Sequence, residues 1–153
     1  MAKKLQQLAL VFFLLLLTFN GRAQQNRVHD VTFYGAKPNE KTDINQVFLK
    51  AFNAACISLK PSKVLIPKGE YYLGNITLEG PCKALIVVEV RGNLLASQDI
   101  KEFKGIDSWV TFQYIDHFTL LGGGVFDGQG AIAWAINDCH KSTKCKKSPI
   151  LSS

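Results

Sequence analysis

The chain has 153 residues, of which 47% are hydrophobic, and a formal net charge of +6 at pH 7. This length fits one domain, and the basic residues do not form the dense stripe with interleaved aromatics that is typical of nucleic-acid-binding proteins. The mild positive charge is compatible with an acidic polysaccharide as a partner.

The first 23 residues have the pattern of a secretory signal peptide. A basic start at Lys3-Lys4 precedes an apolar run over 8–19, and small residues precede the expected cut after Ala23. A membrane anchor is the alternative, which the shortness of the apolar run disfavours. We expect a secreted mature chain over 24–153 with no membrane segment, and a mature charge of +3, because cleavage removes three basic residues and no acidic one.

One amphipathic helix is predicted early in the mature chain. Residues 24–30 are polar and look flexible, and residues 31–36 alternate briefly before a turn. Apolar residues then recur at helical spacing from about Ile44 to Ile57, after Thr42 or Asp43 as N-cap candidates. Pro61 ends this pattern.

Short apolar segments follow Pro61 and are separated by Gly, Pro and Asn. They cover residues 64–66, 71–73, 76–78, 85–90, 94–95, 110–115, 118–121 and 125–126. This pattern predicts an all-β architecture. A Greek-key sandwich gives the same signal, but the continuous apolar run at 85–90 and the early helix favour a parallel β-helix with a helical N-terminal cap.

The most unusual segment is Leu121-Gly122-Gly123-Gly124-Val125-Phe126-Asp127-Gly128-Gln129-Gly130. It holds five glycines in the nine residues from Gly122, and glycine weakens helices and strands alike. The segment therefore predicts sharp turns on both sides of a very short strand, as at the corners of stacked parallel coils. We expect the Asp127 side chain to accept hydrogen bonds from the turn backbone.

The mature chain contains four cysteines, which in a secreted chain favour disulfides: Cys56, Cys82, Cys139 and Cys145. Three pairings are possible, and the spacing does not choose between them. We predict Cys56–Cys82, which would tie the helix end to the turn at Gly80-Pro81, and Cys139–Cys145, which would close a short loop. A zinc site is disfavoured, because no Cys-x-x-Cys occurs and His140 is the one nearby histidine.

One N-glycosylation sequon is present, Asn75-Ile76-Thr77. In a secreted chain Asn75 is expected to carry a glycan and to lie at the surface.

Four segments together resemble the plant polygalacturonases, the family-28 glycoside hydrolases: Val31–Asp43, Val64–Gly69 with the following aromatics, Gly80–Lys83, and Gly122–Cys145 with Trp134. The last segment is most similar to the pollen-type exopolygalacturonases. In the opening segment, Glu40-Lys41 replaces the family's usual glycine. The resemblance implies a right-handed parallel β-helix of the pectin lyase-like type, location in the cell wall, hydrolysis of α-1,4-galacturonan in pectin, and no cofactor or metal.

The family's catalytic motifs do not occur in the chain. Inverting hydrolysis needs an acid and a base carboxyl group roughly 6.5–9.5 Å apart, which the family supplies from Asn-Thr-Asp and Gly-Asp-Asp, with Gly-His-Gly and Arg-Ile-Lys completing the site. None of these four motifs is present, so no catalytic residue is predicted. We expect the N-terminal part of a β-helix, truncated before the catalytic motifs and inactive alone. One alternative is a non-catalytic cell-wall protein that binds pectin. The other is an incomplete gene model of an active exopolygalacturonase.

The remaining candidates carry weaker signals. Asp116 and His117 are adjacent and could be considered an acid/base pair, but neighbours on a strand point to opposite faces and would not face one substrate together. We therefore interpret them as a strand-end turn. Trp134 is expected to pack over the first coils, although stacking on a sugar is an alternative. A basic cluster near the end of the chain is expected to form a solvated loop, and weak contact with pectate is the alternative hypothesis. Its residues are Lys141, Lys144, Lys146 and Lys147. An uncovered end of the β-helix would also favour self-association.

Overall fold

The computed structural model describes residues 27–103 and 108–131. This part of the chain is mostly strand, with one α-helix (α2, Asn45–Cys56) and two 3₁₀ helices (η1, Val31–Tyr34; η2, Ile100–Phe103). The strands are β1 (Arg27–Asp30), β2 (Ser62–Ile66), β3 (Glu70–Tyr72), β4 (Ile76–Glu79), β5 (Ile86–Val90), β6 (Asn93–Leu95), β7 (Val110–Gln113), β8 (Phe118–Leu121) and β9 (Val125–Asp127). Every strand segment predicted after Pro61 is confirmed, with small shifts at the ends.

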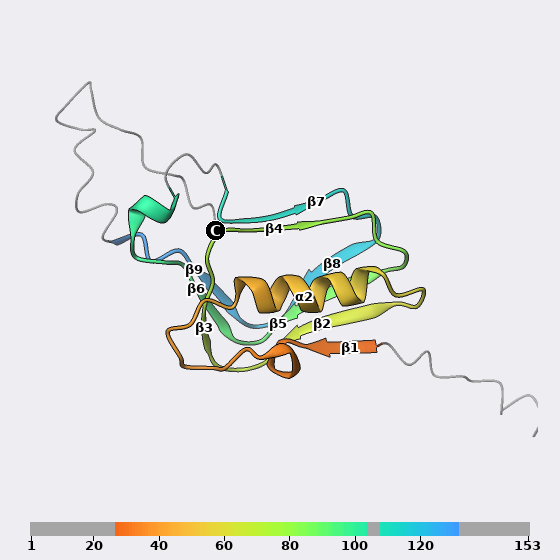
Figure 1. The fold of residues 1–153 in the computed structure, drawn as a ribbon, viewed down its shortest axis with the longest axis horizontal. Coiled ribbons are helices and arrows are strands. Elements are labelled where there is room, and N and C mark those ends of the chain that lie inside the picture. Colours follow the sequence, from red (N-terminus) through yellow and green to blue (C-terminus); the bar gives the residue numbers. More distant parts are fainter. Residues whose placement is uncertain (1–26, 104–107, 132–153) are drawn as a thin grey trace, which may run out of the picture.

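The strands form three sheets, and every ladder is parallel. The strand orders are β1-β2-β5-β8, β3-β6-β9 and β4-β7. From β2 onward, successive strands enter the first, second and third sheet in turn (Figure 1). Two strands that pair in one of these sheets are therefore separated by one full passage of the chain through all three sheets. Strands that are consecutive in the sequence lie in different sheets.

Helix α2 packs against strands of the first and third sheets near the start of the chain. It packs against β1, β2 and β4, and Figure 1 shows it between β4 and β2. The predicted helix is confirmed with one-residue shifts at its ends. Asp43 Oδ1 accepts a hydrogen bond from the Asn45 N–H at 2.9 Å, although the N-cap position itself is occupied by Ile44. Among the described residues, no helix has the length and apolar character needed to cross a membrane.

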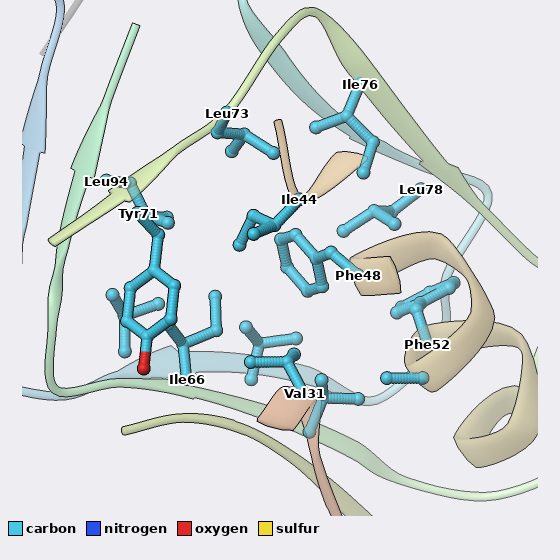
Figure 2. Packing of buried hydrophobic residues seen from close by; sticks show 14 of the residues in the cluster. Val31, Ile44, Phe48, Phe52, Ile66, Tyr71, Leu73, Ile76, Leu78 and Leu94 are labelled. Carbon is cyan, nitrogen blue, oxygen red and sulfur yellow. The ribbon is translucent and has the colours of Figure 1, made fainter. Parts of the chain in front are cut away.

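The hydrophobic core lies between the sheets and α2. Strand alternation directs Val64 and Ile66 inward from β2, whereas Lys63 and Leu65 stay partly exposed. Figure 2 shows the Phe48 ring of α2 surrounded by buried side chains of the loops and strands. The fully buried large side chains are Tyr71, Phe48, Phe52, Ile44, Ile66, Leu73, Leu78, Ile86, Leu94, Val31, Val64 and Val88.

The glycine-rich segment forms the turns that the sequence predicts. Gly122 has φ +129°, and a Cβ built on it would overlap the backbone of Val90. The Gly124 N–H donates to the Val90 carbonyl at 3.0 Å, and a Cβ at this position would meet the Gly92 carbonyl oxygen. There is thus no room for side chains where the β8–β9 turn lies against the β5–β6 turn, which explains why glycines occupy these positions.

The start of the described chain differs from the sequence-based expectation. Residues 27–30 were expected to be polar and flexible, but they form β1, which pairs in parallel with β2 from Arg27↔Ser62 to Asp30↔Leu65. The alternating residues after them form η1, because Asp30 Oδ1 accepts from the Thr32 N–H at 2.8 Å and starts a tight helical turn. The predicted signal peptide, residues 1–23, lies outside the described residues.

Candidate functional site

The predicted disulfide between Cys56 and Cys82 is present, with an S–S distance of 2.06 Å. It joins the end of α2 to the loop between β4 and β5, and the Lys83 N–H donates to the Cys56 carbonyl at 2.9 Å beside it. Such a bond is compatible with an oxidising compartment. The predicted Cys139–Cys145 pair lies outside the described residues. Within the described part of the chain, no group of three or more His, Cys, Asp or Glu side chains could hold a metal ion.

Asn75 lies half-buried in the turn between β3 and β4. Its Nδ2 donates to the backbone carbonyls of Ser108 at 2.5 Å and Trp109 at 3.1 Å. An N-linked glycan would be attached to this same nitrogen, which would keep one hydrogen. A glycosylated Asn75 could therefore keep one of these two bonds, and its glycosylation stays a prediction.

Asp116 and His117 lie in the bend between β7 and β8, so they are not strand neighbours. Both side chains are exposed, and His117 has φ +53°. This agrees with their interpretation as turn residues. Asp127 also has the expected role, because its Oδ1 accepts from the Gln129 N–H at 2.8 Å. Trp134 and the basic cluster of Lys141, Lys144, Lys146 and Lys147 lie outside the described residues.

One cluster of charges was missed by the sequence analysis. Glu89 of β5 is 8% exposed, and its two carboxylate oxygens accept from Lys63 Nζ and Arg91 Nε, each at 2.5 Å. The hydrogen bond from Lys63, and then the one from Arg91, holds the pKa of Glu89 below its usual range. A general acid for glycoside cleavage needs a raised pKa. The lowered pKa of Glu89 does not suit that role, so we interpret this carboxylate as a structural group.

A surface pocket of about 370 Å³ was also missed. It lies where three segments meet: the loop before α2, the end of β3, and the segment that leads into η2 and includes Glu102 of this helix. Its polar and aromatic lining comprises Lys41, Asp43, Tyr72, Ser97, Gln98 and Glu102. The alternation of β3 already indicated that Tyr72 faces outward when Tyr71 faces inward. In contrast, no pattern within a single segment of the sequence indicated that these three segments would converge.

The amino-acid sequence is similar to the sequences of known polygalacturonases. The profile of the family described as "Glycosyl hydrolases family 28" matches residues 56–152. A polygalacturonase of Gossypium hirsutum is 42% identical over 151 residues, which is 98% of this chain and 37% of the relative. A polygalacturonase of Brassica napus is 47% identical over 116 residues, 76% of this chain and 28% of the relative.

An exopolygalacturonase of Platanus acerifolia is 45% identical over 127 residues, which is 82% of this chain and 33% of that protein. The chain thus spans about a third of the length of the curated relatives it matches. Because the family profile covers more than half of its residues, the chain belongs to family 28 of the glycosyl hydrolases.

Proposed function

We propose that residues 24–153 form the N-terminal part of a right-handed parallel β-helix in a secreted, cell-wall polygalacturonase of the pollen exopolygalacturonase type. The observation that carries this proposal is the regular passage of successive strands through three parallel sheets. Helix α2 would then be the N-terminal cap, and the glycine-rich turns would be corners between stacked coils. The names of the relatives support galacturonan in pectin as the substrate class of the whole protein.

We do not expect these 153 residues to catalyse the hydrolysis alone. The four family motifs for the acid, the base and the uronate contacts do not occur in the sequence. Loss of one general acid or base commonly costs about 10²–10⁴-fold in rate, and here both are missing.

The test is a reducing-end assay of the purified mature chain on polygalacturonate. We expect no release above a heat-killed control. Activity above the control that disappears in the Asp116→Asn variant would contradict the proposal, because it would reveal a catalytic site in the bend between β7 and β8.

Sequencing the transcript beyond the Ser153 codon separates the two forms of the proposal. An open frame that continues into Gly-Asp-Asp and Gly-His-Gly would identify a longer, active hydrolase. A stop codon followed by the same motifs out of frame would identify a truncated family member.

A further inference from the structure

The pocket beside β3 has the chemistry of a carbohydrate site, and only the choice of a wall polysaccharide as the source of its ligand rests on the proposed function. Its volume of about 370 Å³ is at the small end of the range for small-molecule sites, roughly 300–1,000 Å³. It therefore suits one or two rings of a small ligand better than a long polymer segment.

Tyr72 provides an aromatic side chain to the pocket from a backbone position that the fold holds in place. The Ile44 N–H donates to the Tyr72 carbonyl at 2.9 Å, Asp43 forms a parallel bridge with Tyr72, and Leu95 of β6 pairs with it on the other side. The side chain is half-buried and lines the pocket, while Tyr71 points into the core. An aromatic ring on a backbone held in this way can pack against the C–H face of a sugar.

The polar groups around Tyr72 are oriented by the protein itself. Asp43 Oδ1 accepts from the N–H groups of Asn45 and Gly74, both at 2.9 Å, and its Oδ2 has no hydrogen-bond partner among the described residues. Gln98 Nε2 donates to Gln129 Oε1 at 2.7 Å, and Gln129 in turn donates to the Ala96 carbonyl.

The Ser97 hydroxyl completes this polar wall. Its oxygen accepts from the Asp99 N–H at 3.1 Å, which leaves its hydrogen to donate. Pre-oriented acceptors and a hydroxyl donor beside an aromatic ring are what recognition of a vicinal diol requires.

The charges of the pocket select against an acidic ligand. Asp43 and Glu102 carry two negative charges and Lys41 one positive charge, so the lining has a net charge of −1. A uronate would meet this net negative charge, whereas the hydroxyls of a neutral sugar can donate to both carboxylates. We propose that this pocket binds a neutral sugar unit, such as a side-chain residue of a wall polysaccharide, and not galacturonate.

The experiment titrates the full mature chain with galactotetraose, arabinotetraose and xylotetraose as neutral probes and with trigalacturonate as the acidic probe. Binding is followed by saturation-transfer NMR of the sugar signals, which detects millimolar dissociation constants. We expect at least one neutral probe to bind more tightly than trigalacturonate, because like charges disfavour the acid.

Three variants locate the site. Tyr72→Ala removes the aromatic wall, and we expect at least about a tenfold loss of affinity for the neutral probe. In Gly74→Ala the new methyl would lie 2.7 Å from Asp43 Oδ2, so it should obstruct this acceptor and weaken binding similarly. Tyr114→Ala is the matched control, since it removes an exposed tyrosine outside the pocket and should leave the affinity unchanged.

The proposal is overturned if none of the three neutral probes binds, or if trigalacturonate binds as tightly as they do. It is also overturned if the neutral probe binds Tyr72→Ala and Gly74→Ala as well as the wild type. Circular dichroism shows whether each variant is folded. If either Tyr72→Ala or Gly74→Ala does not fold, its affinity is not used, and the other variant is compared with the wild type.

Discussion

The charge cluster of Glu89, Lys63 and Arg91 makes the stability of this fold depend on pH. In the Glu89→Gln variant the side chain keeps its size but loses its charge, so both cations lose a charge-assisted partner. Each such hydrogen bond contributes about 1.5–3 kcal/mol, but the side chains of Lys63 and Arg91 are 29% and 51% exposed and can be rehydrated. We expect a net loss of about 1–3 kcal/mol at pH 7, or roughly 3–10 °C in Tm.

The pH dependence follows from the direction of the pKa shift. The folded-state pKa of Glu89 is lowered by the hydrogen bonds from Lys63 and Arg91, relative to an ordinary value of 4.5. Its stabilising contribution is therefore fully present above about pH 4.5, and it is lost as the pH falls through the lowered pKa. The difference in Tm between the wild type and Glu89→Gln should thus be largest near neutral pH and shrink in acid.

His29 contributes in a separate pH window. Burial, and then the nearby Arg27 charge, lowers the pKa of His29 from 6.5, so the fold loses stability as the pH falls below that value. This loss is common to the wild type and Glu89→Gln, and it cancels in their difference.

The assay is reversible unfolding followed by circular dichroism at low protein concentration, from pH 7 to pH 3. Glu79→Gln is the control, because Glu79 is an exposed residue of the neighbouring sheet and its substitution should change Tm little at any pH. An equal difference between wild type and Glu89→Gln at pH 7 and pH 3, or an equal loss in Glu79→Gln, would refute the reasoning.

Three further predictions concern the cysteines, the basic cluster and the last strands. Non-reducing peptide mapping should recover Cys56–Cys82 and Cys139–Cys145. Removing the first bond, which spans 26 residues, should cost about 3–4 kcal/mol in the chain-entropy model, and a dominant Cys82–Cys139 peptide would contradict this pairing. Any pectate binding should be weak and decrease between low and about 0.15 M salt, and binding that survives replacement of Lys141, Lys144, Lys146 and Lys147 would exclude this mechanism. The isolated mature chain should associate in size-exclusion chromatography, whereas a monodisperse monomer that melts cooperatively above ~65 °C would contradict this expectation.

Local sequence patterns were sufficient to predict α2 and every strand after Pro61 that the structure describes. The helix was visible because its buried residues, such as Phe48 and Phe52, recur at helical spacing. The strands were visible because Gly, Pro and Asn separate short β-branched runs. These signals need no information about which strand pairs with which.

The elements that were missed depend on contacts between distant residues. Strand β1 consists of mostly polar residues, and its extended form is stabilised by pairing with β2, about 35 residues later. Glu89 lies inside the run at 85–90 that was treated as continuously apolar, and it was missed because its partner Lys63 is 26 residues away and is brought near by the β2–β5 register. The pocket that Tyr72 lines likewise forms only where three separate segments come together. A single sequence without the strand register cannot reveal such sites.

The strand register also explains why a residue that faces inward need not be buried. Val64, Val88 and Leu120 occupy the same position of consecutive strands in the first sheet, and all three are apolar. Val64 and Val88 are fully buried, but Leu120 is 46% exposed, because β8 pairs with β5 alone among the described residues. Alternation in the sequence thus predicts the direction of a side chain, whereas its burial depends on a neighbouring strand. The exposed Leu120 therefore marks the edge of β8 as the place where a further strand, from this chain or from another copy, would stabilise the fold.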